Sequence, residues 1–170
     1  RLKAKIYRSE RVETHGGSIR IYVSKDKNKK VEKNVKELIK AENKFGIKKF
    51  ETYKKFGEKI YKLRANVRNN IKKLKKNNKL IVGYGAPAKA TTALNFFGIS
   101  NEIDFIVEDN KLKHNKFIPG VNIPIKNKSQ IKNKKNTLIV LAWNFYSDIV
   151  KNNSDLSENF INIKDLETNN

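Results

Sequence analysis

The residues best suited to chemistry in this sequence lie in one stretch, from Leu80 to Thr92. Three apolar residues lead into Gly83-Tyr84-Gly85, and Ala88 follows at the spacing of the pattern G-x-G-x-x-G/A, which is typical of turns that bind nucleotides. In such a turn the first glycine permits a tight bend, the second lets the backbone approach a diphosphate, and the third small residue allows the helix to pack closely on its strand. These roles predict that the turn binds a phosphate-bearing ligand.

One more residue belongs to the same predicted site, Lys89 at the start of the expected helix. Lys89 could reach an anion that is held by the free N–H groups and the dipole of that helix. Pro87 suits the first helical turn, where a backbone N–H has no acceptor within the helix. The alternative is a plain strand, turn and helix whose small residues serve only packing.

The elements that must position this turn alternate regularly from residue 79 onward. Short apolar runs predict buried strands, and helix-forming runs lie between them. The predicted strands are 80–84, 103–107, 137–143 and 160–163, and the predicted helices are 87–97 and 145–151. This order predicts an α/β fold with a small, Rossmann-like, doubly wound parallel sheet, whose ligands bind at the carboxyl ends of the strands.

Further candidates lie at or near those carboxyl ends. The second predicted strand ends at Glu108-Asp109, where a Rossmann fold places a carboxylate that bonds ribose hydroxyls, and Asp109 is the candidate for that role. Trp143 and Asn144 follow the third strand and could line the same cleft, or they are a buried tryptophan and a helix N-cap. Lys116 lies in the loop after Asp109 and is either a ligand contact or a solvated lysine, and His114 is expected to be solvated.

The segment 4–24 predicts a β-hairpin or a bulged strand pair. Ile19, Ile21 and Val23 alternate with Arg, Tyr and Ser, as in a strand with one buried face, and Gly16-Gly17 marks a turn. Because an isolated hairpin is marginally stable, we expect the other strands of its sheet to be missing from this chain.

Two charged helices are predicted between the hairpin and the sheet, at 31–45 and 50–74. Their apolar residues recur every three or four positions, Gly46 is expected to end the first helix, and Asp26 or Asn28 is expected to cap its start. We expect these helices to form a connecting layer without chemistry.

The chain of 170 residues carries a formal net charge of +21. Such a charge favours nucleic acid or an acidic membrane surface as a partner. However, nearly all of the positive charge is Lys rather than Arg, the residue of bidentate phosphate contacts. We therefore favour codon bias in an AT-rich genome, and we expect no specific nucleic-acid partner.

Residue types that are rare or absent bear on metal sites, on membrane partners and on the extent of the sequence. With no Cys and two His, the sequence predicts no metal site. No apolar run approaches the ~20 residues of a membrane span, so we expect no membrane partner and a cytoplasmic protein. The sequence has no Met, and we expect it to be a segment of a longer protein.

The order of these motifs resembles the C-terminal part of the S-adenosylmethionine-dependent sugar C-methyltransferases. The resemblance covers nearly the whole chain and rests on the segments VETHGGSIRIY at 12–22, GYGAPAKATT at 83–92, IDFIVEDN at 103–110, KFIPG at 116–120, IP at 123–124 and LAWN at 141–144. It implies that 1–25 is the end of a class I methyltransferase domain, that 26–79 is a charged helical linker, and that 80–170 is a Rossmann-like C-terminal domain that helps to hold a nucleotide-sugar.

The resemblance also implies a reaction. In the family, a base removes the acidic proton beside the ketone of a nucleotide-linked 4-keto sugar, and the enolate attacks the methyl group of S-adenosylmethionine. The family's methyl-donor site, catalytic His–Glu segment and cysteine-bearing zinc segment match nothing here. We therefore expect S-adenosylmethionine to bind mainly outside this chain, no cofactor and no catalytic residue within it, and no methylation by the chain alone.

Site residues follow from the same resemblance. Those near the substrate at the domain seam would be His15, Gly16, Gly17, Ser18 and Arg20. Those facing the diphosphate or nucleotide would be Gly83, Tyr84, Gly85, Ala86 and Lys89, with Asp109 and Lys116 nearby and Trp143 and Asn144 lining the cleft. Alternatively, His15 is a turn histidine bonded to a backbone carbonyl, and Arg20 pairs with a neighbouring carboxylate.

Two other functional classes remain open. The first is an NAD(P)-type Rossmann domain of an oxidoreductase, which the glycine pattern alone does not separate from a sugar methyltransferase. Against it, the chain lacks a second mononucleotide-binding half and a catalytic partner domain. The second is a basic nucleic-acid-binding module, which the scarcity of Arg disfavours. The sequence predicts no oligomeric state.

Overall fold

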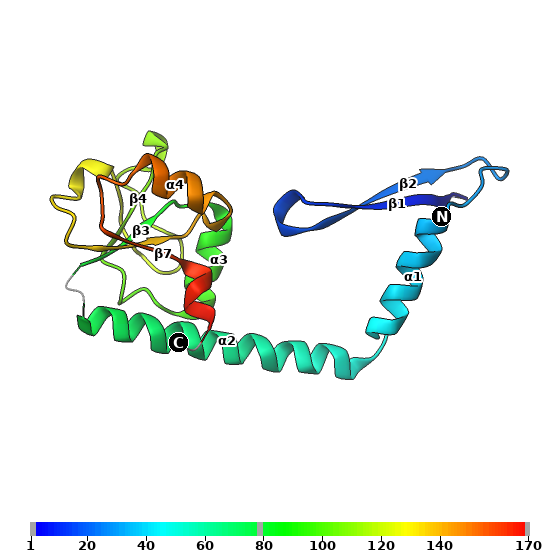
Figure 1. Cartoon of the computed structure of the whole chain (residues 1–170), viewed down its shortest axis with the longest axis horizontal. Coiled ribbons are helices and arrows are strands. Elements are labelled where there is room, and N and C mark those ends of the chain that lie inside the picture. The colour runs from blue at the N-terminus through cyan, green and yellow to red at the C-terminus, as the bar shows by residue number, and fades with distance from the viewer. Residues whose placement is uncertain (1–2, 78–79, 169–170) are drawn as a thin grey trace. The chain divides into compact units, whose positions relative to one another are not determined.

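The computed structural model describes residues 3–77 and 80–168, and it divides into two compact units between Glu58 and Lys59 (Figure 1). The first unit contains an antiparallel hairpin and a helix. The second contains a five-stranded parallel sheet with its covering helices. One long helix, α2 (Phe50–Asn77), contributes residues to both units.

The first unit begins with the predicted hairpin. Its elements are β1 (Lys5–Val12), the short 3-10 turn η1 (Thr14–Gly16) and β2 (Ser18–Ser24). The strands pair antiparallel, with a register shift between Ile6 and Arg8. At this shift the carbonyl of Tyr7 accepts a hydrogen bond of 2.8 Å from the N–H of Glu32. The irregular edge of β1 therefore anchors the start of the following helix.

Helix α1 (Lys33–Phe45) ends as the sequence predicts and begins differently. Gly46 adopts a left-handed conformation (φ 83°) and its N–H bonds the carbonyls of Glu42 and Asn43. The predicted caps Asp26 and Asn28 are wrong, because the connection stays non-helical as far as Glu32, the N-cap residue. Asp26 instead accepts the N–H of Asn28 in the connecting turn.

The apolar face of the hairpin has little cover within the first unit. Ile19, Ile21 and Val23 alternate along β2 as predicted, but they are 43%, 50% and 57% exposed. Of the hairpin residues that the structure describes, only Ser9 is buried. The alternation therefore predicts the strand correctly, while the expected burial of its apolar face is not met within this unit.

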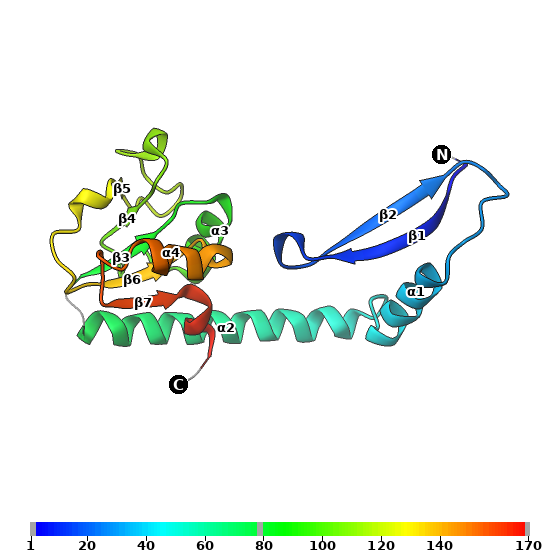
Figure 2. The same ribbon diagram turned by 45° about the horizontal axis from the view of Figure 1, so that its top comes forward.

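The second unit is built on five parallel strands. They are β3 (Ile81–Tyr84), β4 (Phe105–Val107), β5 (Ile125–Lys126), β6 (Thr137–Val140) and β7 (Asn159–Asn162). Their order across the sheet is β5-β4-β3-β6-β7 (Figure 2), the 3-2-1-4-5 order of a Rossmann fold. The predicted α/β, Rossmann-like class is confirmed.

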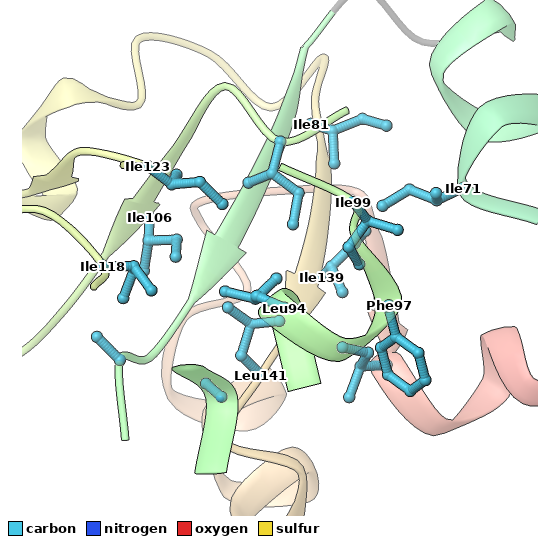
Figure 3. Close-up of a cluster of buried hydrophobic side chains, with 14 of the residues drawn as sticks. Ile71, Ile81, Leu94, Phe97, Ile99, Ile106, Ile118, Ile123, Ile139 and Leu141 are labelled. Atoms are coloured by element: carbon cyan, nitrogen blue, oxygen red, sulfur yellow. The ribbon is translucent and has the colours of Figure 1, made fainter. Parts of the chain in front are cut away.

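Helices and short 3-10 segments cover both faces of this sheet. They are α3 (Ala88–Phe97), η2 (Lys111–Lys113), η3 (Lys128–Gln130), η4 (Trp143–Phe145), α4 (Tyr146–Asn152) and η5 (Ile163–Glu167). On one face, Ile81 and Ile139 pack with Leu94 of α3 and Ile71 of α2 (Figure 3). On the other face, Val82 packs in the cluster against which α4 lies. The sheet is therefore doubly wound, as predicted.

The second half of α2 is part of this core rather than a free linker. Val67 and Ile71 are fully buried against the sheet, and burying each such side chain contributes about 1.5–3 kcal/mol. Asn66 and Asn70 of the same helix donate side-chain hydrogen bonds to the carbonyls of Glu167 and Leu166. The C-terminal segment is thereby bonded to α2.

Candidate functional site

The candidate site lies at the carboxyl edge of the sheet, where strand order reverses. β3 is flanked by β4 on one side and by β6 on the other, so the chain leaves the sheet in opposite directions from these strands. Ligands of doubly wound folds bind at such a switch point. The segments that follow β3, β4 and β6 therefore define the site. Its two halves are here called the β4 side, which contains Glu108, Asp109 and Lys113, and the β6 side, which contains Lys89, Trp143 and Lys164.

The glycine turn after β3 is formed by Gly85 rather than Gly83. Gly85 has a φ of 87°, a conformation that L side chains rarely adopt, while Gly83 lies inside β3. A Cβ on Gly83 would lie 2.7 Å from Cγ1 of Ile106, so this glycine leaves space for core side chains. The predicted tight turn at Gly83 is therefore wrong by two residues.

The missing side chain of Gly85 also serves the protein's own packing. A Cβ at this position would lie 2.9 Å from Cβ of Ala142, in the segment that follows β6. The Gly85 N–H donates to the carbonyl of Val107 at 2.8 Å. These contacts join the ends of all three strands closely, and they use the space that the sequence pattern assigned to a diphosphate.

On the β4 side, the carboxylate of Glu108 occupies the turn. Its Oε2 accepts the N–H of Ala86 at 2.8 Å, and its Oε1 accepts the N–H of Asn110 at 3.1 Å. Lys113 lies 3.3 Å from Oε2 and donates to the carbonyl of Ala86 at 2.9 Å. Burial alone would raise the pKa of Glu108, but the Asn110 and Ala86 N–H groups and then Lys113 outweigh it and lower that pKa. Glu108 is therefore an ionised, fully partnered group.

Asp109, the predicted ribose carboxylate, belongs to a neighbouring polar cluster. Its oxygens accept from the Tyr84 hydroxyl at 2.7 Å and from Lys128 Nζ at 2.8 Å. Lys128 also donates to the Asn153 side chain at 3.0 Å. Burial raises the pKa of Asp109, and the hydrogen bonds from Lys128 and Tyr84 reverse this and lower it. This cluster lines a shallow cavity of about 180 Å³ on the α4 face of the sheet.

On the β6 side, the structure brings Lys89 and Trp143 together. Nζ of Lys89 lies 4.4 Å from the centroid of the Trp143 ring, within the range of a cation–π contact. Nζ of Lys164 lies 6.0 Å from the same centroid. Neither ammonium group has a carboxylate partner among the ion pairs of the described residues. The β6 side therefore presents an indole ring and two unpaired positive charges.

Three other residues of the sheet domain lie outside these contacts or differ from expectation. Asn144 is exposed and caps nothing, because η4 begins at Trp143 and α4 follows from Tyr146; the predicted helix start is wrong. Lys116 is exposed. His114 is not a solvated loop residue, since its Nε2 lies 2.7 Å from the carbonyl of Glu108 and it is half-buried.

The candidates of the hairpin belong to the first unit. Gly16 and Gly17 have φ values of 87° and 113°, so both use the freedom of glycine. Ser18 Oγ donates to the carbonyl of Thr14 at 3.0 Å. The side chain of His15 lies outside the described part of the structure.

Arg20 adopts the alternative role that the sequence left open. It pairs with Glu10 at 2.8 Å, and the same carboxylate oxygen accepts the Tyr22 hydroxyl at 2.8 Å. Arg8 bonds the other oxygen at 2.9 Å. The hydrogen bond from Tyr22, followed by those from Arg20 and Arg8, lowers the pKa of Glu10. These polar groups form an ordered network beside the glycine turn of the hairpin.

Comparisons with known proteins agree with the motifs of the sequence. A family model described as the C-methyltransferase C-terminal domain matches residues 13–162. C-methyltransferase NovU from Streptomyces niveus is 31% identical to the chain over 150 residues, which make up 86% of this chain and 36% of that protein. The chain belongs to the C-methyltransferase C-terminal domain family. The predicted resemblance is confirmed, and the chain spans about a third of the length of this relative.

Four polar residues of the site in this C-methyltransferase C-terminal domain carry little signal in the sequence. The sequence indicates Glu108 only as the neighbour of Asp109, and little in it distinguishes Lys113, Lys128 or Lys164 from the other lysines. All three lysines lie in a chain that is crowded with lysine, so composition hides them. The only signal for Lys113 is its spacing of five residues from Glu108 in the loop after β4.

Within residues 3–77 and 80–168, no helix of this C-methyltransferase domain is long and apolar enough to cross a membrane. The same residues contain no group of three or more His, Cys, Asp or Glu that could hold a metal ion.

Proposed function

We propose that this domain is the substrate-binding part of an S-adenosylmethionine-dependent C-methyltransferase whose substrate is a nucleotide-linked keto sugar. The observation that carries the proposal is the β6 side of the site, where Lys89 lies 4.4 Å above the Trp143 ring at the switch point of a Rossmann-like sheet. An aromatic ring beside unpaired ammonium groups suits a ligand that combines a planar or apolar part with a diphosphate.

The chain's own residues would bind and orient this substrate. The N–H groups of Ala88 and Lys89, in the first turn of α3, have no acceptor among the described hydrogen bonds, and such groups attract anions. We infer that the Lys89 and Lys164 side chains, together with these amides, neutralise the diphosphate, while Trp143 covers the nucleoside or the sugar.

The remaining steps of methyl transfer would use parts of the protein outside this chain. S-adenosylmethionine, when bound, supplies the methyl group. The Gly85 turn after β3 does not fit it, because the Gly85 and Ala86 N–H groups are already bonded within the protein. We therefore infer that this chain contributes substrate affinity and orientation, and that the base which removes the substrate's proton lies elsewhere.

The hairpin would complete the sheet of the methyl-donor domain. Ile19, Ile21 and Val23 form an apolar row that the first unit leaves largely exposed, which supports a packing partner. In this arrangement the Gly16-Gly17 turn and Arg20 would lie near the substrate. Comparing amide exchange in the hairpin of this chain and of the full-length protein tests this point: equal protection of Ile19 to Val23 in both would refute it.

Calorimetry on the chain tests the binding function. We expect weak binding of thymidine diphosphate and no binding of NAD or S-adenosylmethionine. Lys89→Ala should weaken the binding of thymidine diphosphate about 2- to 5-fold, whereas Lys151→Ala, which removes an exposed lysine of α4, should leave it unchanged. Clear binding of NAD would instead support an oxidoreductase-type Rossmann domain.

A further inference from the structure

The backbone N–H groups of the glycine turn are bonded within the protein, although the sequence pattern predicts that they face a ligand. In nucleotide-binding turns of this pattern, the backbone N–H groups of the turn face the diphosphate of the ligand. Here the N–H of Gly85 donates to Val107 and the N–H of Ala86 donates to Glu108. The donors that the pattern assigns to a ligand are therefore used inside the protein.

The group that takes the Ala86 N–H is itself an anion held in a fixed position. Glu108 Oε2 lies 2.8 Å from the Ala86 nitrogen and 3.3 Å from Lys113 Nζ, and Oε1 accepts from Asn110. The side chain of Glu108 is only 13% exposed. A backbone N–H, a lysine ammonium and a second N–H surrounding one anion are the contacts by which proteins bind a phosphate group.

Lys113 fixes the same arrangement from the other side. Its ammonium group donates to the carbonyl of Ala86 at 2.9 Å and pairs with Glu108. Glu108 therefore accepts the backbone N–H of Ala86, and Lys113 donates to the carbonyl oxygen of the same residue. Asp109, the next residue in the chain, takes no part, since its oxygens face Tyr84 and Lys128.

We propose that Glu108 determines ligand specificity by occupying, with its own carboxylate, the place in the glycine turn that a ligand diphosphate would need. Glu108 and Lys113, here called the turn clamp, keep dinucleotides and other diphosphates off the β4 side. A bound anion is consequently restricted to the β6 side, near Lys89. This proposal concerns the turn alone and holds for any substrate of the domain.

Titration of ¹⁵N-labelled full chain with pyrophosphate tests the turn clamp, with the amide signals of Gly85 and Ala86 as the readout. In the wild-type chain these two signals should not shift at millimolar pyrophosphate. In Glu108→Ala the Ala86 N–H and Lys113 Nζ lose their anion, and both signals should shift saturably, with an affinity at least about tenfold higher than in the wild type. In Glu108→Ala/Lys113→Ala this gain should disappear.

Asp109→Ala is the matched control, because it removes one carboxylate from the same loop without touching Ala86. It should behave as the wild type. A saturable shift of the Ala86 amide in the wild-type chain would overturn the proposal, as would equal gains in Glu108→Ala and Asp109→Ala. If Glu108→Ala does not give a folded spectrum, Glu108→Gln decides: a gain of about threefold or more supports the turn clamp, and no gain overturns it.

Discussion

The two sides of the switch point differ in how their polar groups are partnered. On the β4 side, Glu108 bonds Ala86 and Lys113, and Asp109 bonds Lys128. On the β6 side, Lys89 and Lys164 approach the ring of Trp143 and have no carboxylate partner among the described ion pairs. The β4 side is satisfied without a ligand, whereas the β6 side retains charges that a ligand can satisfy.

This difference separates residues that build the site from residues that bind. Removing one partner of a mostly buried, hydrogen-bonded charge lowers stability, because the other partner is left unsatisfied. A partly exposed lysine over an aromatic ring contributes little to stability and keeps its capacity to bind an anion. Substitutions on the two sides should therefore affect different properties.

The largest expected effect is on stability, from Glu108→Ala on the β4 side. The change leaves the Ala86 N–H without its acceptor and Lys113 Nζ without its carboxylate partner, and should lower the free energy of unfolding by about 1–3 kcal/mol. Lys89→Ala on the β6 side should lower it by less than about 0.5 kcal/mol. Urea unfolding followed by circular dichroism measures both, and equal losses would remove the distinction between the two sides.

The next effect is on catalysis by the full-length enzyme. Lys89→Ala should raise KM for the proposed nucleotide-sugar substrate about 2- to 5-fold, corresponding to the loss of one exposed ionic contact of up to about 1 kcal/mol, and should lower kcat by less. The reason is that Lys89 would hold the diphosphate equally in the ground state and the transition state. Lys151→Ala is the control and should leave both constants unchanged. A large loss of kcat at constant KM would place Lys89 in the chemistry instead.

The fold was predictable from the sequence because its signals are local. Each signal defines an element within a few residues. The mostly apolar run from Ile103 to Val107 predicts a strand, Gly46 predicts the end of a helix, and the alternation in Ile19-Arg20-Ile21 predicts another strand. The exact ends were less predictable: β6 stops at Val140, and the chain turns into η4 at Trp143, although its apolar run continues to that residue.

The site was predictable only in part, because its contacts join distant residues. The sequence predicts both Lys89 and Trp143 as site residues, but nothing in their separation along the chain indicates that Lys89 Nζ lies 4.4 Å from the centroid of the Trp143 ring. The glycine pattern predicted a cradle for a diphosphate, and it has no means of showing that Glu108, 22 residues after Ala86, fills that turn. Which glycine makes the bend also depends on Ile106 and Ala142, which the pattern does not include.

A smaller effect should appear in the pH dependence of stability. The pKa of Glu108 is lowered in the folded state, so its contribution is complete above the unfolded pKa of about 4.3 and is lost as pH falls through the folded pKa. The difference in unfolding free energy between wild type and Glu108→Gln should therefore shrink as the pH is lowered below about 4.3. Asp109→Asn should show a weaker dependence, because the Asp109 side chain is 60% exposed and solvent screens its pairing. A difference that grows toward low pH would contradict the ionised state of Glu108.

The smallest expected effect is optical and reports on the β6 side directly. Trp143 is the sole tryptophan of the chain, so its emission follows the surroundings of one ring. Thymidine diphosphate should change this emission and protect the ring from iodide quenching, because the ligand would cover Trp143 beside Lys89. Glu108→Ala should show the same protection, since Glu108 lies on the β4 side, while Lys89→Ala should show less protection at the same ligand concentration. If calorimetry detects binding but the emission of Trp143 and its quenching stay constant, the ligand binds away from the β6 side, and the comparison between the two sides fails.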